Sequence, residues 1–190
     1  FIEHHRAHLA SKHLQMAYQP KPEYVFRGLG GIDDGFDWAD LYIDDCSKMV
    51  KLLEQTNCAD FIKKDSLRRL GKLDALLEPV RGNEDVVFIH GDLTTLNMIV
   101  SDKSIGFIDP FNSRFTHKEL DLVNLNAYDA DMDLLGVYHS QYPLKEGYLA
   151  RIAMYDWFNN LFHYFNLSTF PVDYFLDLTQ KIETQFTSGM

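Results

Sequence analysis

Three polar residues that could do chemistry follow a short hydrophobic run near the middle of the chain. Val86–Ile89 leads directly into HGDLTTLN, residues 90–97, which contains His90, Asp92 and Asn97. Polar side chains at the end of a buried strand either cap the local backbone or take part in binding and catalysis. The elements around the segment decide between these interpretations.

Two apolar runs after this segment predict a β-hairpin. Met98–Val100 and Ile105–Ile108 are separated by four polar residues, a length typical of a hairpin loop. Asn97 just before the first strand and Asp109 just after the second should therefore lie at the same end of the hairpin. Asp92 belongs to the loop that enters that end. Two carboxylates and an amide offer oxygen ligands, which suit Mg²⁺ better than zinc.

The spacing of His90, Asp92 and Asn97 matches the catalytic loop of kinases. In that loop the Asp accepts the proton of the substrate hydroxyl, the Asn binds a metal, and a second Asp, here Asp109, binds metal as well. Phosphoryl transfer needs these groups because charge on the phosphates must be neutralised and the acceptor oxygen aimed in line. Each residue alone could be a turn residue. The combination of strand, loop, hairpin and Asp-Pro turn favours phosphotransfer.

The segments HGDLTTLNMIV, GFIDP and ELDLVNL resemble the aminoglycoside phosphotransferase and choline kinase superfamily, which shares the protein-kinase fold. The resemblance implies that Asp92 is the catalytic base and that Asn97 and Asp109 bind Mg²⁺, with ATP as the phosphate donor. It also implies structural roles for His90 and for Asp121, which would hold the catalytic loop by hydrogen bonds to its backbone.

Within that superfamily, three longer segments resemble the fructosamine kinases (ketosamine 3-kinases). They are GFDWADLYIDD, IDPFNSRFTHKELDL and HSQYPLKEGYLARIAMYDWFNNLFHYFNL, and the likeness covers roughly residues 7–166. The implied acceptor is a ketosamine, whereas choline and aminoglycosides are the acceptors of other branches. Thr94, Thr95 and Leu96 stand where fructosamine kinases usually carry Trp and Ser-Gly.

Helical periodicity surrounds this central β-segment, so the predicted fold class is α+β and mostly helical. Helices are predicted over residues 1–18, over about 65–77 and over 145–166, and leucines 67, 70, 73 and 77 of the second of these are expected to point inward. Three more helices are predicted to begin at an N-cap at Asp37, at a Thr116/Glu119 capping box and at Pro171. The aromatic residues of the 145–166 helix, among them Trp157 and Phe158, are expected to be mostly core.

The 190 residues suffice for a single domain. The resemblance identifies residues 1–190 as the larger, C-terminal lobe of a protein-kinase-like fold, with the small hairpin carrying the metal site. A kinase also needs a lobe with a Gly-rich loop and a strand Lys. We expect that this N-terminal lobe is absent from the chain and is supplied in cis or in trans.

Composition narrows the class of partner. The formal net charge of −10 disfavours nucleic acid and anionic membranes as partners. No apolar run approaches the roughly 18 residues of a membrane-spanning helix. Cys46 and Cys58 lack CxxC spacing, which disfavours a zinc site or a disulfide framework and makes a cytoplasmic location the expectation.

Other residues could contact a small-molecule acceptor. Asp129 and Asp131 lie in an acidic cluster that could attract an amine-bearing substrate, although a solvated acidic loop explains the cluster equally well. Arg114 could contact an anion or pair with Asp121; a surface position is equally compatible.

Two other functions stay open beside the leading hypothesis, an ATP- and Mg²⁺-dependent kinase acting on a hydroxyl of a small molecule. The chain could be an isolated or degenerate kinase lobe that acts as a non-catalytic binding module. A metal-dependent hydrolase built on His90, Asp92 and Asp109 is the weaker alternative, because no second histidine or HxxE pair lies nearby in the sequence to complete its site.

Overall fold

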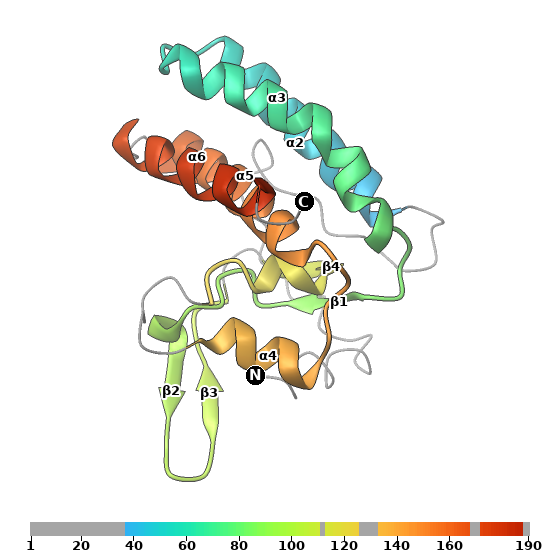
Figure 1. The fold of residues 1–190 in the computed structure, drawn as a ribbon. Helices are drawn as coiled ribbons and strands as arrows, with labels where there is room; N and C mark the ends of the chain where they lie inside the picture. Colours follow the sequence, from blue (N-terminus) through green and yellow to red (C-terminus); the bar gives the residue numbers. More distant parts are fainter. Residues whose placement is uncertain (1–36, 111–112, 126–132, 168–171, 188–190) are drawn as a thin grey trace.

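A computed structural model of the chain describes residues 37–110, 113–125, 133–167 and 172–187. Within those residues the fold is mostly helical α+β, as predicted, with five α-helices and two two-stranded sheets (Figure 1). The helices are α2 (Trp38–Glu54), α3 (Asp60–Leu77), α4 (Leu134–Gln141), α5 (Tyr148–Leu167) and α6 (Val172–Thr187). The strands are β1 (Val86–Ile89), β2 (Met98–Val100), β3 (Ile105–Phe107) and β4 (Arg114–His117).

Three short 3₁₀ segments link these elements: η1 (Glu78–Val80), η2 (Thr95–Asn97) and η3 (Lys118–Asp121). None of the described helices is long and apolar enough to cross a membrane. The helix predicted over residues 1–18 and the helix start predicted at Pro171 lie outside the described residues.

Helix α2 begins where the sequence predicts. Asp37 has an extended backbone, and its carboxylate accepts a hydrogen bond from the amide of Ala39 (2.8 Å), which makes Asp37 the N-cap. Trp38 at the first helical position is buried, and its indole N–H donates to the carbonyl of Val80 in η1 (3.0 Å). The start of α2 is thereby fastened to the segment that leads into β1.

Helix α3 begins at Asp60, earlier than predicted, and its inward face differs from the predicted leucine stripe. Leu73 and Leu77 are buried as expected, but Leu70 is only partly buried and Leu67 is 48% exposed. The prediction that all four leucines point inward was therefore wrong.

The physical reason is that polar residues occupy part of the buried stripe of α3. The hydroxyl of Ser66 accepts a hydrogen bond from the indole N–H of Trp157 on α5 (3.1 Å). The guanidinium of Arg69 lies over the Trp157 ring, 4.2 Å from its centroid, and Arg69 is only 3% exposed. Hydrophobic periodicity does not reveal a face that is buried through such contacts.

The main hydrophobic core lies between the α2–α3 pair and the α5–α6 pair, whose members run side by side in Figure 1. Trp157, Phe158 and Phe175 are fully buried in it. Both aromatic residues of α5 named from the sequence are therefore core, as predicted. A second cluster of buried apolar residues includes Leu93 and Leu122. Leu93 belongs to residues 90–97, which we call the catalytic-loop segment after the predicted role.

Strand β1 pairs with β4 rather than with the hairpin strands. The pairing is antiparallel, with Val87 opposite Thr116 and Ile89 opposite Arg114. The predicted Thr116/Glu119 capping box was therefore wrong: Thr116 is a strand residue, and a short 3₁₀ helix without a side-chain cap follows it. Backbone pairing with a distant strand overrides the local capping signal here, because β1 needs a hydrogen-bonding partner.

The predicted hairpin is confirmed. Strands β2 and β3 pair antiparallel with Met98 opposite Phe107, and the amide of Ser101 donates to the carbonyl of Ser104 across the loop (2.9 Å). Figure 1 shows the hairpin extending away from the helices. Val100 and Ile105, near its tip, are 73% and 50% exposed.

Helix α5 begins at Tyr148 instead of residue 145. Gly147 has φ +79°, a left-handed conformation that cannot continue into a preceding helical turn. Helix α4 was not predicted, and its N-cap is Asp133, whose carboxylate accepts from the amide of Gly136 (2.9 Å). Asp129 and Asp131, the candidate substrate contacts, lie outside the described residues.

A buried ion pair joins η3 to α5. Arg151 Nε donates to Glu119 Oε2 (2.8 Å) and Arg151 Nη2 donates to Glu119 Oε1 (2.7 Å), and each residue is 1% exposed. Arg151 also donates to the carbonyls of Lys145 and Glu146. Burial alone would lower the pKa of Arg151, but the hydrogen bonds with Glu119 raise it above its ordinary value, so Arg151 is charged.

A neutral histidine lies beside this ion pair. His117 is fully buried, and its ring stacks on that of Trp38 at 4.8 Å. Neither ring nitrogen has a hydrogen-bond partner within the described part of the chain, and the carboxylates of Asp85 and Glu119 lie 3.9 and 3.8 Å away. Burial, opposed by Asp85, lowers the pKa of His117 to about 3. The side chain is therefore uncharged at neutral pH.

We expect Arg151→Met to lower the free energy of unfolding by about 3–5 kcal/mol, because Glu119 would stay buried without its partner. Urea denaturation measures this loss. The matched control is Arg68→Met, which breaks the exposed Arg68–Glu183 pair (2.7 Å) and should cost about 1 kcal/mol or less. Equal losses in the two variants would contradict the importance assigned to the buried pair.

We also expect His117 to make the fold sensitive to acid. Its folded pKa lies below its ordinary value of 6.5, so the unfolded chain binds the proton more readily. The free energy of unfolding should fall as the pH drops from about 6.5 toward 3, by up to about 1.4 kcal/mol per pH unit from this residue. His117→Phe keeps a ring against Trp38 and should show a shallower pH dependence in denaturation experiments. Identical slopes would show that His117 does not carry the effect.

Candidate active site

The backbone that follows β1 is held by a buried carboxylate. Asp121, 2% exposed, accepts a hydrogen bond from the amide of His90 through Oδ2 (2.9 Å) and one from the amide of Gly91 through Oδ1 (2.8 Å). Gly91 has φ +84°, a conformation that a side chain would strain. The hydroxyl of Ser113 donates to the carbonyl of His90 (2.8 Å). The backbone of His90 and Gly91, which leads to Asp92, is thus held by Asp121 and Ser113.

His90 connects this turn to the hairpin. Its ring Nε2 hydrogen-bonds to the carbonyl of Ile108 (2.9 Å), and the residue is 2% exposed. A carbonyl oxygen can only accept, so Nε2 donates and carries the ring proton. The bond places the end of the hairpin's second strand next to the start of the catalytic-loop segment.

Asn97 contacts both Asp92 and the returning hairpin strand. Its side-chain Nδ2 donates to the carbonyl oxygen of Asp92 and to Asp92 Oδ2, each at 2.9 Å. Its backbone carbonyl accepts from the amide of Ile108 (3.0 Å). Both amide hydrogens of Asn97 are therefore used, and its Oδ1 is the side-chain atom left to accept or to coordinate.

Asp109, the next residue after Ile108, has an unusual backbone. Its φ is +53°, and it is the one non-glycine residue with positive φ in the described part of the chain. The left-handed conformation costs roughly 1–2 kcal/mol for a residue with a side chain, although Asp tolerates it better than most. Pro110 follows and favours an extended conformation at the preceding position. Strain of this kind is concentrated at functional sites.

Comparison with known families gives a match over this region. A family model described as fructosamine kinase matches residues 36–187, which span the catalytic-loop segment, the hairpin and the helices of the core. The chain belongs to the fructosamine kinase family. Comparison with curated proteins gives no significant match. Membership of the fructosamine kinase family places the chain among the kinases, which transfer phosphate from ATP to an acceptor, here a small molecule.

Metal binding in this fructosamine kinase family member would depend on a small donor set. No group of three His, Cys, Asp or Glu side chains that could hold a metal ion occurs among the residues that the structure describes. The predicted ligands are one carboxylate, Asp109, and the amide oxygen of Asn97, and the carboxylate of the predicted base, Asp92, hydrogen-bonds to Asn97. Such a set suits Mg²⁺, which takes one or two carboxylates and fills its other positions with waters and phosphate oxygens.

Arg114 lies on β4, opposite Ile89 of β1, instead of at an exposed surface position. Burial lowers the pKa of Arg114 to about 10, against the opposing influence of Tyr42, Asp45 and Asp121. The charge of Asp121 acts on Arg114, but pairing of the two side chains, considered from the sequence, stays a prediction. Contact of Arg114 with an acceptor stays a prediction.

His163 on α5 was not singled out from the sequence. It is half-buried, and burial lowers its pKa while the carboxylate of Asp92 raises it. The charge of the predicted catalytic base therefore acts on α5, which the sequence analysis treated mainly as a core helix. The available signal was a histidine interrupting the aromatic run of that helix.

We expect Asp109→Gly to separate strain from function. Glycine adopts φ +53° without steric cost, so the variant should be as stable as the parent or more stable by up to about 1 kcal/mol, as judged by urea denaturation. In protein that includes the ATP-gripping lobe, the variant should lose kinase activity, because a carboxylate is removed from the predicted metal site. The control is Asp102→Gly in the hairpin loop, which should keep activity; retained activity in Asp109→Gly would contradict the role of Asp109.

Proposed function

We propose that the chain is the catalytic lobe of a ketosamine kinase that transfers the γ-phosphoryl group of ATP to a hydroxyl of the acceptor with Mg²⁺. Membership of the fructosamine kinase family supports the reaction class and suggests the acceptor class. The observation that carries the mechanism is the hydrogen bond from Asn97 Nδ2 to Asp92 Oδ2 (2.9 Å). It ties the predicted base to the predicted metal ligand.

Asp92 acts as the base in this proposal. Asn97 fixes one carboxylate oxygen of Asp92, Oδ2, and this leaves Oδ1 to accept a hydrogen bond from the acceptor hydroxyl. Asp92 orients that hydroxyl and receives its proton as the oxygen attacks phosphorus. The Asp121 clamp on the amides of His90 and Gly91 keeps the loop from shifting while this happens.

Asn97 Oδ1 and the carboxylate of Asp109 would hold Mg²⁺. When bound, the ion neutralises negative charge on the phosphoryl group in transfer. The hydrogen bonds of Ile108 with His90 and Asn97 set the position from which Asp109 follows. The strain at Asp109 is what we expect of a carboxylate held in place for a purpose other than stability.

Exposed apolar side chains on the hairpin support the proposal that this lobe works with a second one. They are Ile99 (57% exposed), Val100 (73%), Ile105 (50%) and Ile108 (40%). Val100 and Ile105 are partners in the hairpin register and lie on one face, whereas Ile99 lies on the other. Exposed apolar side chains on both faces are consistent with a hairpin that contacts a ligand or another protein element. We propose that the ATP-gripping N-terminal lobe and the nucleotide cover it, in cis or in trans.

The alternative is a binding module without catalysis, as an isolated lobe would be. Under the proposal, the chain alone should consume little ATP, and its consumption should rise when the N-terminal lobe is supplied in cis or in trans. Failure of any such lobe to restore activity would favour the binding module. A panel of fructosyl-amines, choline and aminoglycosides then identifies the acceptor, with fructosyl-amines expected to be phosphorylated fastest.

We expect Asp92→Asn, in protein that includes the ATP-gripping lobe, to lower kcat by about 100-fold or more, the usual contribution of a general base. The Kd for ATP should stay close to that of the parent, because Asp92 contacts the acceptor and not the nucleotide in this scheme. Steady-state kinetics and calorimetry measure the two quantities. Asp102→Asn in the exposed hairpin loop is the matched control and should change neither. Near-normal turnover in Asp92→Asn would rule out the assigned base.

A further inference from the structure

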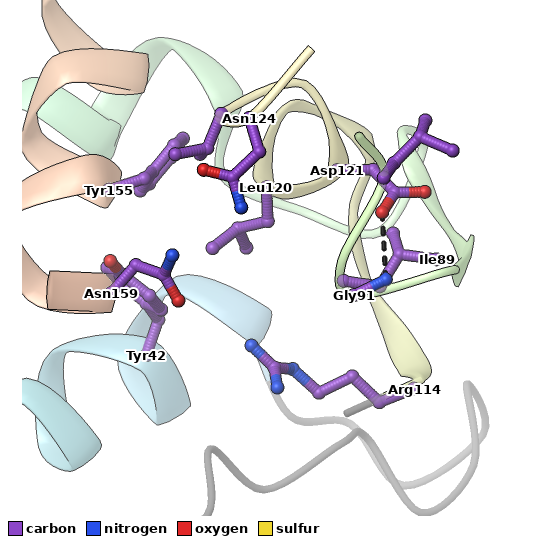
Figure 2. A pocket seen from close by; sticks show the side chains of 11 residues that line it. Tyr42, Ile89, Gly91, Arg114, Leu120, Asp121, Asn124, Tyr155 and Asn159 are labelled. Atoms are coloured by element: carbon purple, nitrogen blue, oxygen red, sulfur yellow. Dashed lines mark hydrogen bonds between the residues drawn. The ribbon is translucent and has the colours of Figure 1, made fainter. Parts of the chain in front are cut away.

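A small polar cavity lies behind the catalytic-loop segment. It is lined by residues of α2, of β1 and the turn after it, of β4, of η3 and the segment after it, and of α5. Figure 2 shows Gly91 and Asp121 on one side of the space and Asn124, Tyr155 and Asn159 on the other. The cavity therefore touches the same two residues whose hydrogen bond holds the catalytic loop.

Three side chains around this cavity have unused hydrogen-bonding groups. The hydroxyl of Tyr155 is buried and has no hydrogen-bond partner in the described part of the chain, and Tyr155 is 1% exposed. The half-buried amide side chains of Asn124 and Asn159 likewise make no hydrogen bond within the residues that the structure describes. Tyr155 and Asn159 are four residues apart on α5 and so lie on one face of the helix.

Leaving these groups unsatisfied would be costly. A buried hydroxyl without a partner loses roughly 1–3 kcal/mol relative to water, and native proteins satisfy nearly all such groups with protein or ordered water. The cavity has a volume of about 20 Å³. One water molecule needs about 10–15 Å³ by the same kind of measure, so the space suits one oxygen and is too small for a phosphate.

The charges around the cavity favour an uncharged occupant. Arg114 is the cationic side chain in its lining, and it interacts electrostatically with Asp45 and Asp121. An anion would meet the carboxylate of Asp121, and a cation would meet the guanidinium of Arg114. The groups left over, a phenol and two amides, donate to and accept from a neutral hydroxyl equally well.

We propose that the cavity formed by Tyr155, Asn124 and Asn159 is a binding site for one uncharged hydroxyl oxygen, supplied by a water molecule or by a hydroxyl group of the acceptor. The bound oxygen connects α5 to the residues after η3 and supports the catalytic loop from behind. The site itself stands independently of the proposed function, whereas an acceptor hydroxyl as the occupant rests on it.

The sign of one stability change tests the site. If an oxygen occupies the cavity, Tyr155→Phe breaks a satisfied hydrogen bond and should lower Tm by about 2–4 °C. If the cavity is dry, the same change removes a buried hydroxyl without a partner, and Tm should rise. Tyr148→Phe at the start of α5, a half-buried residue whose ring stacks on His139 and keeps that contact as Phe, is the control and should leave Tm unchanged. A rise of Tm in Tyr155→Phe would overturn the proposal.

A crystal structure of the protein that shows ordered waters provides an independent test. The expected result is one oxygen within hydrogen-bonding distance of Tyr155 Oη and of at least one asparagine amide. A second structure, with a fructosyl-amine bound, identifies the source: an unchanged water, or a hydroxyl of the acceptor in its place. An empty cavity or an ion in either structure would overturn the site. This test needs no turnover. It can therefore contradict the cavity site while the kinase assays support the proposed function, and it can support the site while those assays contradict the function.

Discussion

The candidate site depends on the carboxylate of Asp121 and on the two backbone amides that it holds. His90 and Gly91 leave β1 in a conformation with a left-handed glycine, and their N–H groups would otherwise be buried without acceptors. An ionised carboxylate that accepts two amide hydrogens gives charge-assisted bonds, which are stronger than neutral ones. These two hydrogen bonds from a buried side chain therefore fix the backbone that leads into Asp92.

The short helix η3 connects the hydrogen bonds of Asp121 with His90 and Gly91 to the rest of the fold. Asp121 at its end accepts hydrogen bonds from the amides of His90 and Gly91, and Glu119 two residues earlier holds Arg151 of α5. Strand β4, which precedes η3, pairs with β1, and β1 in turn leads into the clamped turn. A displacement of α5 would therefore be transmitted from Glu119 to Asp121, two residues further along the backbone. The cavity lined by Tyr155 and Asn159 lies in the same region.

The part of the site that could be predicted from the sequence is the part encoded by nearby residues. The spacing within residues 90–97 and the hairpin after them required only local rules, and the hairpin is present as predicted. The Thr116 capping signal failed because β4 pairs with a strand almost thirty residues earlier, and no local pattern reports that partner. The inward face of α3 failed because Ser66 and Arg69 are buried through contacts with Trp157. The polar cavity needs side chains from several elements and could not have been found from the sequence.

The backbone of Asp109 has a consequence for how relatives of this chain can be interpreted. A residue with a side chain in a left-handed conformation before proline lowers stability, and under the proposed function this cost is tolerated only while the carboxylate of Asp109 binds metal. In a lineage released from catalysis, replacement of this residue by glycine would be neutral for function and favourable for folding, so it should accumulate early. Glycine at the position of Asp109 would then indicate that a relative has lost kinase activity, even where it keeps the histidine and asparagine that correspond to His90 and Asn97.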